Sequence, residues 1–366
     1  MKILYVEPYY SGSHKQWIDS YKKNSRYKIE ILGLPGRKWK WRMHGGAVTL
    51  AQEYNKLNKN FDLIICSDML NLPVFKSLTN LQKNNTKVVM FFHENQFSYP
   101  WSPNDPDRKF NRDLHYGYIN YTSSLVSDHN FFNSYYHRNQ YIKDLKTYLN
   151  KMPDYNNKNT IKLIEDKSST LYIGCDLKNN FKLKKSKHFK PIILWNHRWE
   201  YDKNPELFFN TLFKLNEKNI DFSLIVVGES FTNYPSIFDV AKEKLSSKII
   251  HFGYAETREK YLNLLSLSNI LPVTSNQDFF GISIIEAISA CNYPLLPNKL
   301  TYPELINNKI FFYNNDGQYF DRLLEIMNNF KDYDAEVEKL SKHIIKEYDW
   351  ESISRIYDQT FLELFN

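Results

Sequence analysis

The segment NILPVTSNQDFFGISIIEAISA, residues 269–290, holds a complete strand–loop–helix unit. Its first seven residues form a short apolar run that is typical of a buried strand. A polar loop follows, and the isoleucines after Gly281 recur at a spacing that indicates a helix with one apolar face. Units of this kind build parallel α/β sheets. Asp278 and Glu286 lie on either side of Gly281, eight positions apart.

The same alternation recurs along the chain and predicts two α/β domains of the doubly wound type, facing a central cleft. We expect domains at 1–178 and 191–347, joined by a polar, lysine-rich linker at 179–190. The apolar residues of 348–366 recur at helical spacing, so we expect a C-terminal helix there that packs back across the domain junction. The predicted strands are 2–8, 28–35, 61–68, 87–94, 129–134 and 169–177, then 191–197, 222–230, 248–254, 269–275 and 293–298, with helices at 14–23 and 205–218 among them.

Composition narrows the class of protein. The 366 residues are 42% hydrophobic, and no apolar run reaches the roughly 18 residues that span a bilayer. The start, MKILYVEPYY, is expected to be the first strand and not a signal peptide. Three widely spaced cysteines form neither a disulfide framework nor a metal-site spacing, which favours a reduced, cytoplasmic setting without membrane contact. A net charge of +7 permits a nucleic-acid or phosphorylated partner without requiring one.

The helix predicted after Gly281 offers an anion site at its N-terminus, where unpaired N–H groups and the helix dipole favour negative charge. Gly281 allows close approach to the backbone, and Glu286 lies about 7 Å further along the helix at ~1.5 Å per residue. One extended ligand could therefore meet Asp278, a phosphate-binding backbone at 281–283, and Glu286. A nucleotide-sugar has this layout. The alternative is an acidic loop residue beside an ordinary amphipathic helix.

Two cations follow another predicted strand. Arg198 and Lys203 lie before a helix, where Arg can bind a diphosphate bidentately and Lys can act as a point charge. The alternative is that both form salt bridges with neighbouring acids, namely Glu200, Asp202 and Glu206.

The first half contains two further candidate sites after predicted strands. Gly12 lies between two serines in a strand-to-helix turn that could approach phosphate, although it does not match the G-x-G-x-x-G pattern. His93, Glu94, Asn95 and Gln96 follow a buried strand, and a histidine there could hydrogen-bond or transfer a proton. A hydrogen-bonded loop histidine without a catalytic role is the alternative.

The segment LPGRKWKWRMHGG, residues 34–46, alternates cations with tryptophans and is expected to be a loop. Charges for phosphates and rings for unstacked bases are what looped nucleic acid needs from a protein. The same segment could instead pack its tryptophans on the core.

Taken together, these segments resemble the retaining glycosyltransferases of family 4, which have the GT-B fold, and more specifically the tRNA-queuosine α-mannosyltransferases. Asp278 stands where family 4 more often has Glu, and Ser11 where the family tends to have glycine. The resemblance rests on SGSHKQW (11–17), LPGRKWKWRM (34–43), FFHENQFSYP (91–100), FFNS (131–134), HRWEYDKNPELFF (197–209), GESFTNYP (228–235), HFGY (251–254), DFFGISIIEA (278–287) and YPLLPNKLTYPE (293–304).

The resemblance implies transfer of mannose, with retention, from GDP-mannose to a cyclopentene hydroxyl of queuosine at the wobble position of a tRNA, without a metal or other cofactor. It places His93 beside the sugar and acceptor, and the diphosphate on Arg198 and Lys203. The implied catalytic residues are His93, Asp278, Arg198 and Lys203. The implied donor-binding residues are Gly12, Ser13, Arg198, Lys203, Gly228, Glu229, Asp278, Phe280, Gly281, Ile282, Ser283 and Glu286. The residues expected to bind the acceptor are His14, Lys38, Trp39, Lys40, Trp41, Arg42, Glu94, Asn95 and Gln96.

Two other classes of protein fit parts of the sequence. One is another enzyme of the same fold: a transferase that uses another nucleotide-sugar or acts on a lipid, glycan or small molecule, or a sugar-nucleotide epimerase. It would share the donor residues but has no evident need of residues 34–46. A non-catalytic RNA-binding module would need the basic segment but not the combination of Asp278, Arg198, Lys203 and Glu286.

Overall fold

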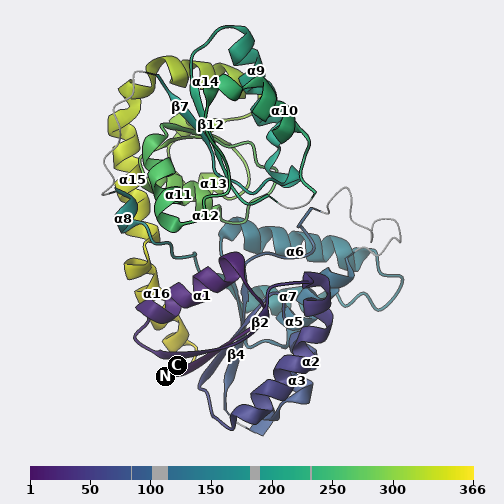
Figure 1. The fold of residues 1–366 in the computed structure, drawn as a ribbon. Helices are drawn as coiled ribbons and strands as arrows, with labels where there is room; N and C mark the ends of the chain where they lie inside the picture. The colour runs from purple at the N-terminus through teal and green to yellow at the C-terminus, as the bar shows by residue number, and fades with distance from the viewer. Residues whose placement is uncertain (84, 101–113, 182–189, 231–232) are drawn as a thin grey trace. The chain divides into compact units, whose positions relative to one another are not determined.

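The computed structural model describes residues 1–83, 85–100, 114–181, 190–230 and 233–366. The chain divides into two compact units: Met1–Gly174 together with Trp350–Asn366, and Cys175–Asp349 (Figure 1). The first boundary lies four residues before the predicted one, and the last helix belongs to the first unit. Most of the predicted linker, 182–189, lies outside the described residues, and Lys178–Phe181 form a short helix, α8.

The sheet of the first unit has six parallel strands in the order β2-β1-β3-β4-β5-β6. Every residue of β3 is buried, as expected for a parallel strand covered on both faces. The strands are β1 (Lys2–Tyr10), β2 (Lys28–Pro35), β3 (Leu63–Ser67), β4 (Lys87–Phe92), β5 (His129–Phe132) and β6 (Ser168–Thr170).

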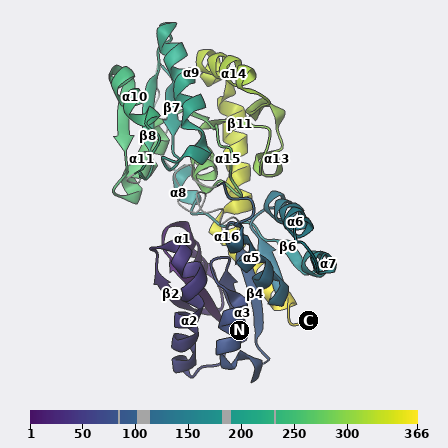
Figure 2. The same cartoon turned by 90° about the vertical axis from the view of Figure 1, so that its right-hand side faces the viewer.

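Helices cover both faces of this sheet. Figures 1 and 2 show α1 and α16 against one face and α2, α3 and α5 against the other. This division follows from chain order, because right-handed crossovers change face where the strand order reverses. The helices are α1 (Gly12–Asn24), α2 (Trp39–Leu57), α3 (Leu72–Leu78), α5 (His115–Val126), α6 (Tyr135–Asn150), α7 (Asn159–Asp166) and α16 (Trp350–Glu363).

Helix α16 is the C-terminal helix expected at 348–366, and it packs against α1 of the first unit. The buried rings of Tyr357 and Phe361 lie against Tyr21, with centroids 5.1 and 6.0 Å away. Asp358, also buried, accepts hydrogen bonds from the Tyr21 hydroxyl at 2.8 Å and the backbone N–H of Arg26 at 2.8 Å. The last helix therefore fixes α1, whose first turn carries the predicted phosphate-side residues.

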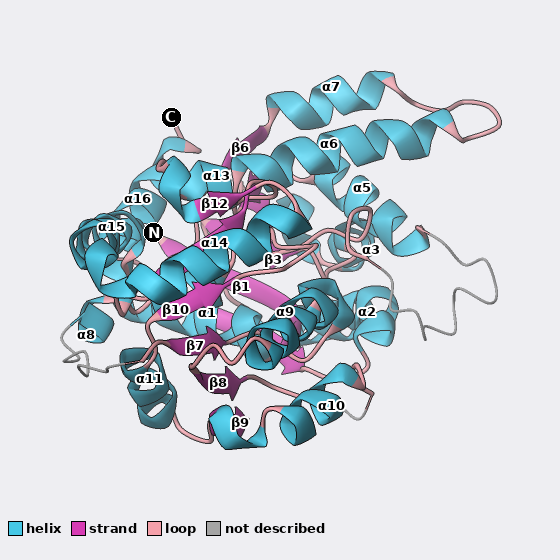
Figure 3. Cartoon of the chain, turned by 90° about the horizontal axis from the view of Figure 1, so that it is seen from above, coloured by secondary structure: helices cyan, strands magenta, loops and turns pink. Residues whose placement is uncertain are grey.

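The second unit repeats the architecture with parallel strands in the order β12-β11-β10-β7-β8-β9. Figure 3 shows the labelled helices on either side of its strands. The strands are β7 (Ile192–Trp195), β8 (Ser223–Val227), β9 (Ile249–Gly253), β10 (Ile270–Pro272), β11 (Tyr293–Pro297) and β12 (Phe312–Tyr313). The helices are α9 (Pro205–Glu217), α10 (Ile237–Lys244), α11 (Arg258–Leu267), α12 (Ile282–Ser289), α13 (Tyr302–Leu305), α14 (Asp316–Asn329) and α15 (Asp334–Tyr348).

The strand order reverses once in each sheet, between β1 and β3 in the first unit and between β7 and β10 in the second. Ligands of open α/β sheets bind beyond the carboxyl ends of the strands at such switch points. The predicted α/β class with two doubly wound parallel sheets is confirmed. In each sheet, a site is therefore expected beyond the carboxyl ends of the strands at the switch point.

Three local predictions are wrong. The closing strand expected at 169–177 is only Ser168–Thr170, and the strand expected at 269–275 is only Ile270–Pro272; the residue after each, Leu171 and Val273, still donates a backbone hydrogen bond to the neighbouring strand. The expected loop at 34–46 is mostly helix, since α2 begins at Trp39. Lys38 adopts a left-handed conformation with φ 56°, which lets the chain turn from β2 into α2 within three residues.

Within the described residues, no helix combines the length and the apolar character that a membrane crossing requires.

Candidate active site

Lys203 and Asp278 meet at the switch point of the second sheet. Lys203 follows β7 and Asp278 follows β10, and the Lys203 ammonium lies 2.9 Å from Asp278 Oδ1. It also lies 2.7 Å from the Gln277 carbonyl and 3.1 Å from Asp202 Oδ2. Burial acts against charge on Lys203, but the Asp278 and Asp202 carboxylates outweigh it and raise the pKa of the lysine. The alternative expected from sequence, a salt bridge to a neighbouring acid, thus occurs between Lys203 and Asp202, and Asp278 is a further partner that was not expected.

Asp278 is held from two sides. Its second carboxylate oxygen accepts a hydrogen bond from the hydroxyl of Tyr302 in α13. Burial raises the pKa of Asp278, but the charge of Lys203 and the hydrogen bonds it receives lower the pKa below its ordinary value. Asp278 is therefore an ionised, fixed acceptor whose position is set by three elements.

Arg198 remains at the surface of the same edge. Its guanidinium lies 3.1 Å from the Glu200 carboxylate, and its side chain is 46% exposed. The backbone beside it is fixed by β8, because the Trp199 N–H donates to the Glu229 carbonyl at 2.9 Å. A Cβ on Gly228 would stand 2.0 Å from the His197 carbonyl oxygen, so only glycine allows this approach. Gly228 and Glu229 thus position the arginine-bearing loop.

Helix α12 begins at the predicted glycine. Gly281 is its N-cap in a left-handed conformation with φ 83°, and no side chain caps the helix. Asn196 Nδ2 donates to the Ser283 carbonyl at 2.6 Å, which ties this turn to β7. Ile282 and Ser283 are half-buried, whereas Phe280 is 3% exposed and packs its ring on Tyr348. The Phe280 side chain is a core residue, which leaves only its backbone for a ligand.

Glu286 lies on α12 but is 5% exposed and already has two partners. Arg258 Nη1 lies 2.6 Å from Oε1, and the Tyr261 hydroxyl donates to Oε2 at 3.0 Å. Both partners come from α11, and neither was identified from sequence. Their only sequence signal is their place soon after the strand-like HFGY segment.

The first unit has its polar residues at the corresponding place, at the carboxyl ends of its strands. Gly12 starts α1 with φ 52°, and nothing lies within 4 Å of where its Cβ would be. Ser13 is exposed, and α1 has neither an acid in its first turn nor a side-chain cap. The turn is packed closely against the β2–α2 connection, because a Cβ on Gly36 would lie 2.0 Å from Ser11 Cβ.

A buried cluster lies beneath that turn. Glu7, at the end of β1, is fully buried and accepts from His14 Nδ1 at 2.9 Å. The His14 ring packs on that of His93, with centroids 4.3 Å apart and planes tilted by 37°. Asp68 follows β3, is fully buried, and accepts from the His93 backbone N–H at 2.8 Å. Glu7 and Asp68 were missed from sequence, although both end predicted strands.

The predicted acceptor residues form two groups: His14 with residues 94–96, and the basic segment at 38–42. His14 is 8% exposed and belongs to the buried cluster, and the Asn95 oxygen is used by the backbone N–H groups of Phe97 and Ser98 at 3.1 and 3.0 Å. Gln96 is also buried and donates to Glu94 at 3.1 Å. Among these four residues, Glu94 and Gln96 form a hydrogen-bonded pair, and Asn95 holds a turn.

The basic segment forms the first turns of α2. Trp39 packs on Tyr116 of α5 at 5.1 Å, and the Lys40 ammonium lies 5.7 Å from the Trp39 ring centre. Arg42 Nε donates to the Pro35 carbonyl at 3.3 Å. Trp41 is 65% exposed, and Lys38 is also exposed. Thus one tryptophan packs on the core, as in the alternative interpretation of this segment, and the other faces outward.

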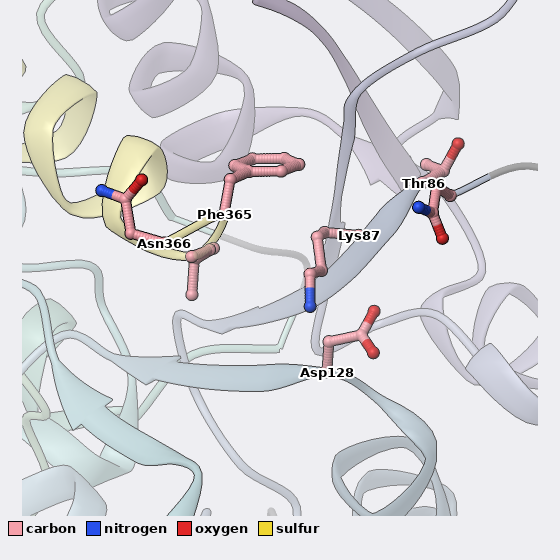
Figure 4. A pocket seen from close by; sticks show the side chains of 7 residues that line it. Thr86, Lys87, Asp128, Phe365 and Asn366 are labelled. Atoms are coloured by element: carbon pink, nitrogen blue, oxygen red, sulfur yellow. The ribbon is translucent and has the colours of Figure 1, made fainter.

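Two further observations concern other places where a ligand or a metal ion could bind. A hollow of about 450 Å³ is lined by Asn85, Thr86, Lys87, Asp128, Leu364, Phe365 and Asn366. Figure 4 shows it from close by. It lies at the amino ends of β4 and β5, the opposite edge of the sheet from the polar residues above. Among the residues that the structure describes, no group of three or more His, Cys, Asp or Glu side chains is arranged to hold a metal ion.

Comparison with known proteins agrees with this picture. Residues 2–175 match the family described as the tRNA-queuosine alpha-mannosyltransferase N-terminal domain, and residues 178–347 match glycosyl transferases group 1. A Drosophila melanogaster protein named tRNA-queuosine alpha-mannosyltransferase is 35% identical over 314 residues, which are 83% of this chain and 81% of that protein.

Solved structures share the fold. A glycosyltransferase from Rickettsia africae superposes with a TM-score of 0.69 at 18% identity, over 100% of this chain and 98% of that one. Anabaena HepE, crystallised in complex with UDP, superposes with a TM-score of 0.71 at 13% identity, over 99% and 100% of the two chains.

Two doubly wound sheets, each with a polar site at its switch point, together with the group 1 match, define a glycosyltransferase of the GT-B fold. The chain belongs to the tRNA-queuosine alpha-mannosyltransferase family. The family recognised from the sequence motifs is thereby confirmed.

Proposed function

We propose that this glycosyltransferase moves mannose from GDP-mannose to the cyclopentene hydroxyl of queuosine at the wobble position of a tRNA, with retention of anomeric configuration. The observation that carries the proposal is the 35% identity to the Drosophila protein across 83% of this chain. Both parts of the chain also match, so that the similarity is not confined to a shared donor-binding domain.

The second unit supplies the donor chemistry in this proposal. Arg198 is half-exposed and can bind a diphosphate, while the buried Lys203 adds positive charge behind it. Asp278, ionised and fixed by Lys203 and Tyr302, accepts hydrogen bonds from sugar hydroxyls. The unpaired N–H groups at the start of α12 face the phosphate, and Glu286 binds the ribose.

The first unit supplies the groups for the acceptor. His93 is proposed to lie beside the sugar and the attacking hydroxyl, with Gly12 and Ser13 at the diphosphate. The exposed Trp41 and Lys38 at the start of α2 are proposed to contact the anticodon arm.

A direct test incubates the protein with queuosine-containing tRNA and GDP-mannose, then digests the RNA and weighs the nucleosides. The expected product is queuosine plus one hexose. Matched reactions use the same tRNA with unmodified guanosine at the wobble position, and UDP-glucose or UDP-N-acetylglucosamine as donor. A hexose added to the guanosine-containing tRNA would overturn the acceptor assignment.

Donor choice is tested separately by thermal unfolding without RNA. GDP-mannose should raise the Tm more than either UDP-sugar, because a ligand that binds only the folded state stabilises it in proportion to RT ln(1 + [L]/Kd). A larger shift with a UDP-sugar would move the donor assignment to uridine nucleotides and leave the acceptor assignment intact.

A further inference from the structure

The buried cluster of the first unit contains a charged pair to which the family match assigns no role. The Glu7 carboxylate is fully buried and accepts four hydrogen bonds. Its donors are the Tyr5 hydroxyl at 2.8 Å, the Tyr9 backbone N–H at 2.8 Å, the Ser67 hydroxyl at 2.9 Å and His14 Nδ1 at 2.9 Å. Of these donors only His14 can carry a positive charge, so it is the one that can offset the cost of burying a carboxylate.

His14 lies in the first turn of α1, two residues after Gly12. Nδ1 is used by Glu7, and the ring packs on the tilted ring of His93 with centroids 4.3 Å apart. The other ring nitrogen, Nε2, is thus the one left for a ligand at a helix end where unpaired N–H groups already favour an anion.

We propose that Glu7 is a positioning residue that holds His14 as an imidazolium beside His93, so that His14 adds a fixed positive charge to the first turn of α1. This inference rests on the proposed function, which places the donor diphosphate at that turn. Glu7 itself does not touch the substrate in this scheme and acts only through His14.

The short distance between the two rings also bears on the charge of His93. Two imidazolium rings 4.3 Å apart would repel, so a charged His14 keeps its neighbour neutral. His93 is packed further by Trp17 and Phe91, each with its ring centroid 4.9 Å away, and its Nε2 is buried without a hydrogen-bond partner in the described structure. A neutral His93 can accept a hydrogen bond from a hydroxyl, which a protonated ring cannot.

The titratable groups that the structure describes around the pair bear on its charge. Burial alone would lower the pKa of His14, but Glu7, then Asp68 and Glu94, raise it to about 9. Burial lowers the pKa of His93 well below its ordinary value, and the charges of His14 and of His137 in α6 add to this effect. The neutral Tyr5 completes the set, since burial raises its pKa well above the ordinary value.

The decisive variant is Glu7→Gln, which keeps the shape of the side chain and removes its charge. Tyr5→Phe and Ser67→Ala are matched controls, because each removes one neutral donor from the same carboxylate and leaves the charge pair in place. The protonation state of His14 is read in the protein labelled with ¹⁵N-histidine, without substrate, from pH 6 to pH 10.

In the wild-type protein and both controls, His14 should stay charged at pH 8 and lose its proton near pH 9. In Glu7→Gln it should already be neutral at pH 8. A neutral His14 in the wild-type protein at pH 8, or a charged one in Glu7→Gln, would overturn the proposal. If Glu7→Gln fails to fold, the wild-type titration still decides, since a midpoint near the ordinary value of 6.5 would refute the pair.

The pH dependence of kcat distinguishes the proposed role of Glu7 from a purely structural one. Relative to wild type, kcat of Glu7→Gln should fall by about tenfold for each pH unit by which the midpoint of the His14 titration lies below the assay pH. At pH 6, where His14 is again protonated, kcat should recover. A loss of the same size at pH 6 and pH 8 would contradict the proposal. The imidazole titration needs no substrate, so a failure of the queuosine or GDP-mannose assignment would leave it unaffected.

Discussion

Lys203 and Asp278 form a buried ion pair with their charged atoms 2.9 Å apart, although 75 residues separate them in sequence. The pair joins the loop after β7 to the loop after β10, the two strands on either side of the switch point of the second sheet. The three protons of the ammonium are matched by three acceptors, Asp278, Asp202 and the Gln277 carbonyl. Lys203 therefore fixes the position of Asp278, and in the proposed function it acts on the donor phosphate by its charge.

Replacement of Lys203 tests this structural role. Lys203→Met should lower the free energy of unfolding by about 3–5 kcal/mol, because it leaves two largely buried carboxylates without their cation. Denaturant unfolding gives the value, and Lys342→Met on the exposed face of α15 is the control. A loss below about 1 kcal/mol, typical of surface pairs, would show that the pair does not hold the two loops together.

Replacement of Asp278 separates chemistry from stability. Asp278→Asn keeps the shape and an oxygen facing Lys203, but removes the negative charge that would accept sugar hydroxyls. We expect kcat/KM to fall by about 10²–10³, as for other electrostatic groups removed from active sites. Asp239→Asn, on an exposed stretch of α10, should behave like the wild-type enzyme. Turnover within threefold of wild type in Asp278→Asn would remove this residue from the catalytic set.

Arg198 is predicted to bind the diphosphate through its half-exposed guanidinium. Arg198→Ala should cost about 2–4 kcal/mol of transition-state stabilisation while leaving the Tm nearly unchanged, since its ion pair with Glu200 is partly exposed. Steady-state kinetics measure the effect, and Arg355→Ala on α16 serves as the control for loss of an exposed arginine. Near-normal turnover would refute the assignment.

The start of α2 is predicted to bind the anticodon arm. Neutralising Lys38, Lys40 and Arg42 to Gln should weaken tRNA binding and flatten its salt dependence, by roughly 0.7 log units per log unit of salt for each phosphate that the variant no longer neutralises. Trp41→Ala should weaken binding without changing that slope, because an exposed ring contributes stacking and no charge.

The control for this surface neutralises Lys339, Lys342 and Lys346, three exposed lysines of α15. Binding is measured by titration at several salt concentrations, and donor binding by thermal shift. Loss of donor binding with normal tRNA binding in the α2 variant would show that this surface belongs to the donor site.

The buried cluster of the first unit predicts how stability depends on pH. The pKa of His14 is raised to about 9, and burial, opposed by His14, raises the pKa of Asp68 to about 8. Both groups hold protons in the folded state that the unfolded chain has released, so the free energy of unfolding should fall as the pH rises from 7 to 9. Differential scanning calorimetry across this range measures the slope.

Asp68→Asn should flatten that slope and raise the Tm at pH 9, because the amide cannot ionise and its oxygen can still accept from the His93 backbone N–H. An unchanged slope would indicate that Asp68 is already ionised at pH 7. On the acid side, burial lowers the pKa of His93 and of His137, so stability should also fall as the pH drops below about 6.5.

Local patterns were sufficient for the architecture and for part of the site. Short apolar strands alternating with helical spacing predicted two parallel sheets, and a glycine between two acids predicted the start of α12 at Gly281. These features depend on neighbours within one strand–loop–helix unit, so they can be read along the chain. The residue types after β7 and β10 likewise located Arg198, Lys203 and Asp278 without any knowledge of their partners.

The basic segment shows where local pattern fails. Its alternation of cations and rings resembles a loop, but Met43, Ala47 and Leu50 give α2 a buried face that extends the helix back to Trp39. The helix turns Trp39 toward Tyr116 and leaves Trp41 outside. Which tryptophan packs on the core depends on α5, a helix that follows two further strands and another helix along the chain.

Tertiary structure also decided which side chains of the site are buried and which of them pair, because their partners come from other elements of the chain. Glu7 and His14 are close in sequence, but their charge states depend on Asp68 and His93, which other strands bring to the same edge. Glu286 could be located from sequence, but its partners Arg258 and Tyr261 are brought to its carboxylate by α11. Sequence shows which groups follow each strand, whereas sheet order determines which of them meet, because parallel strands that adjoin in space are separated by whole helices along the chain.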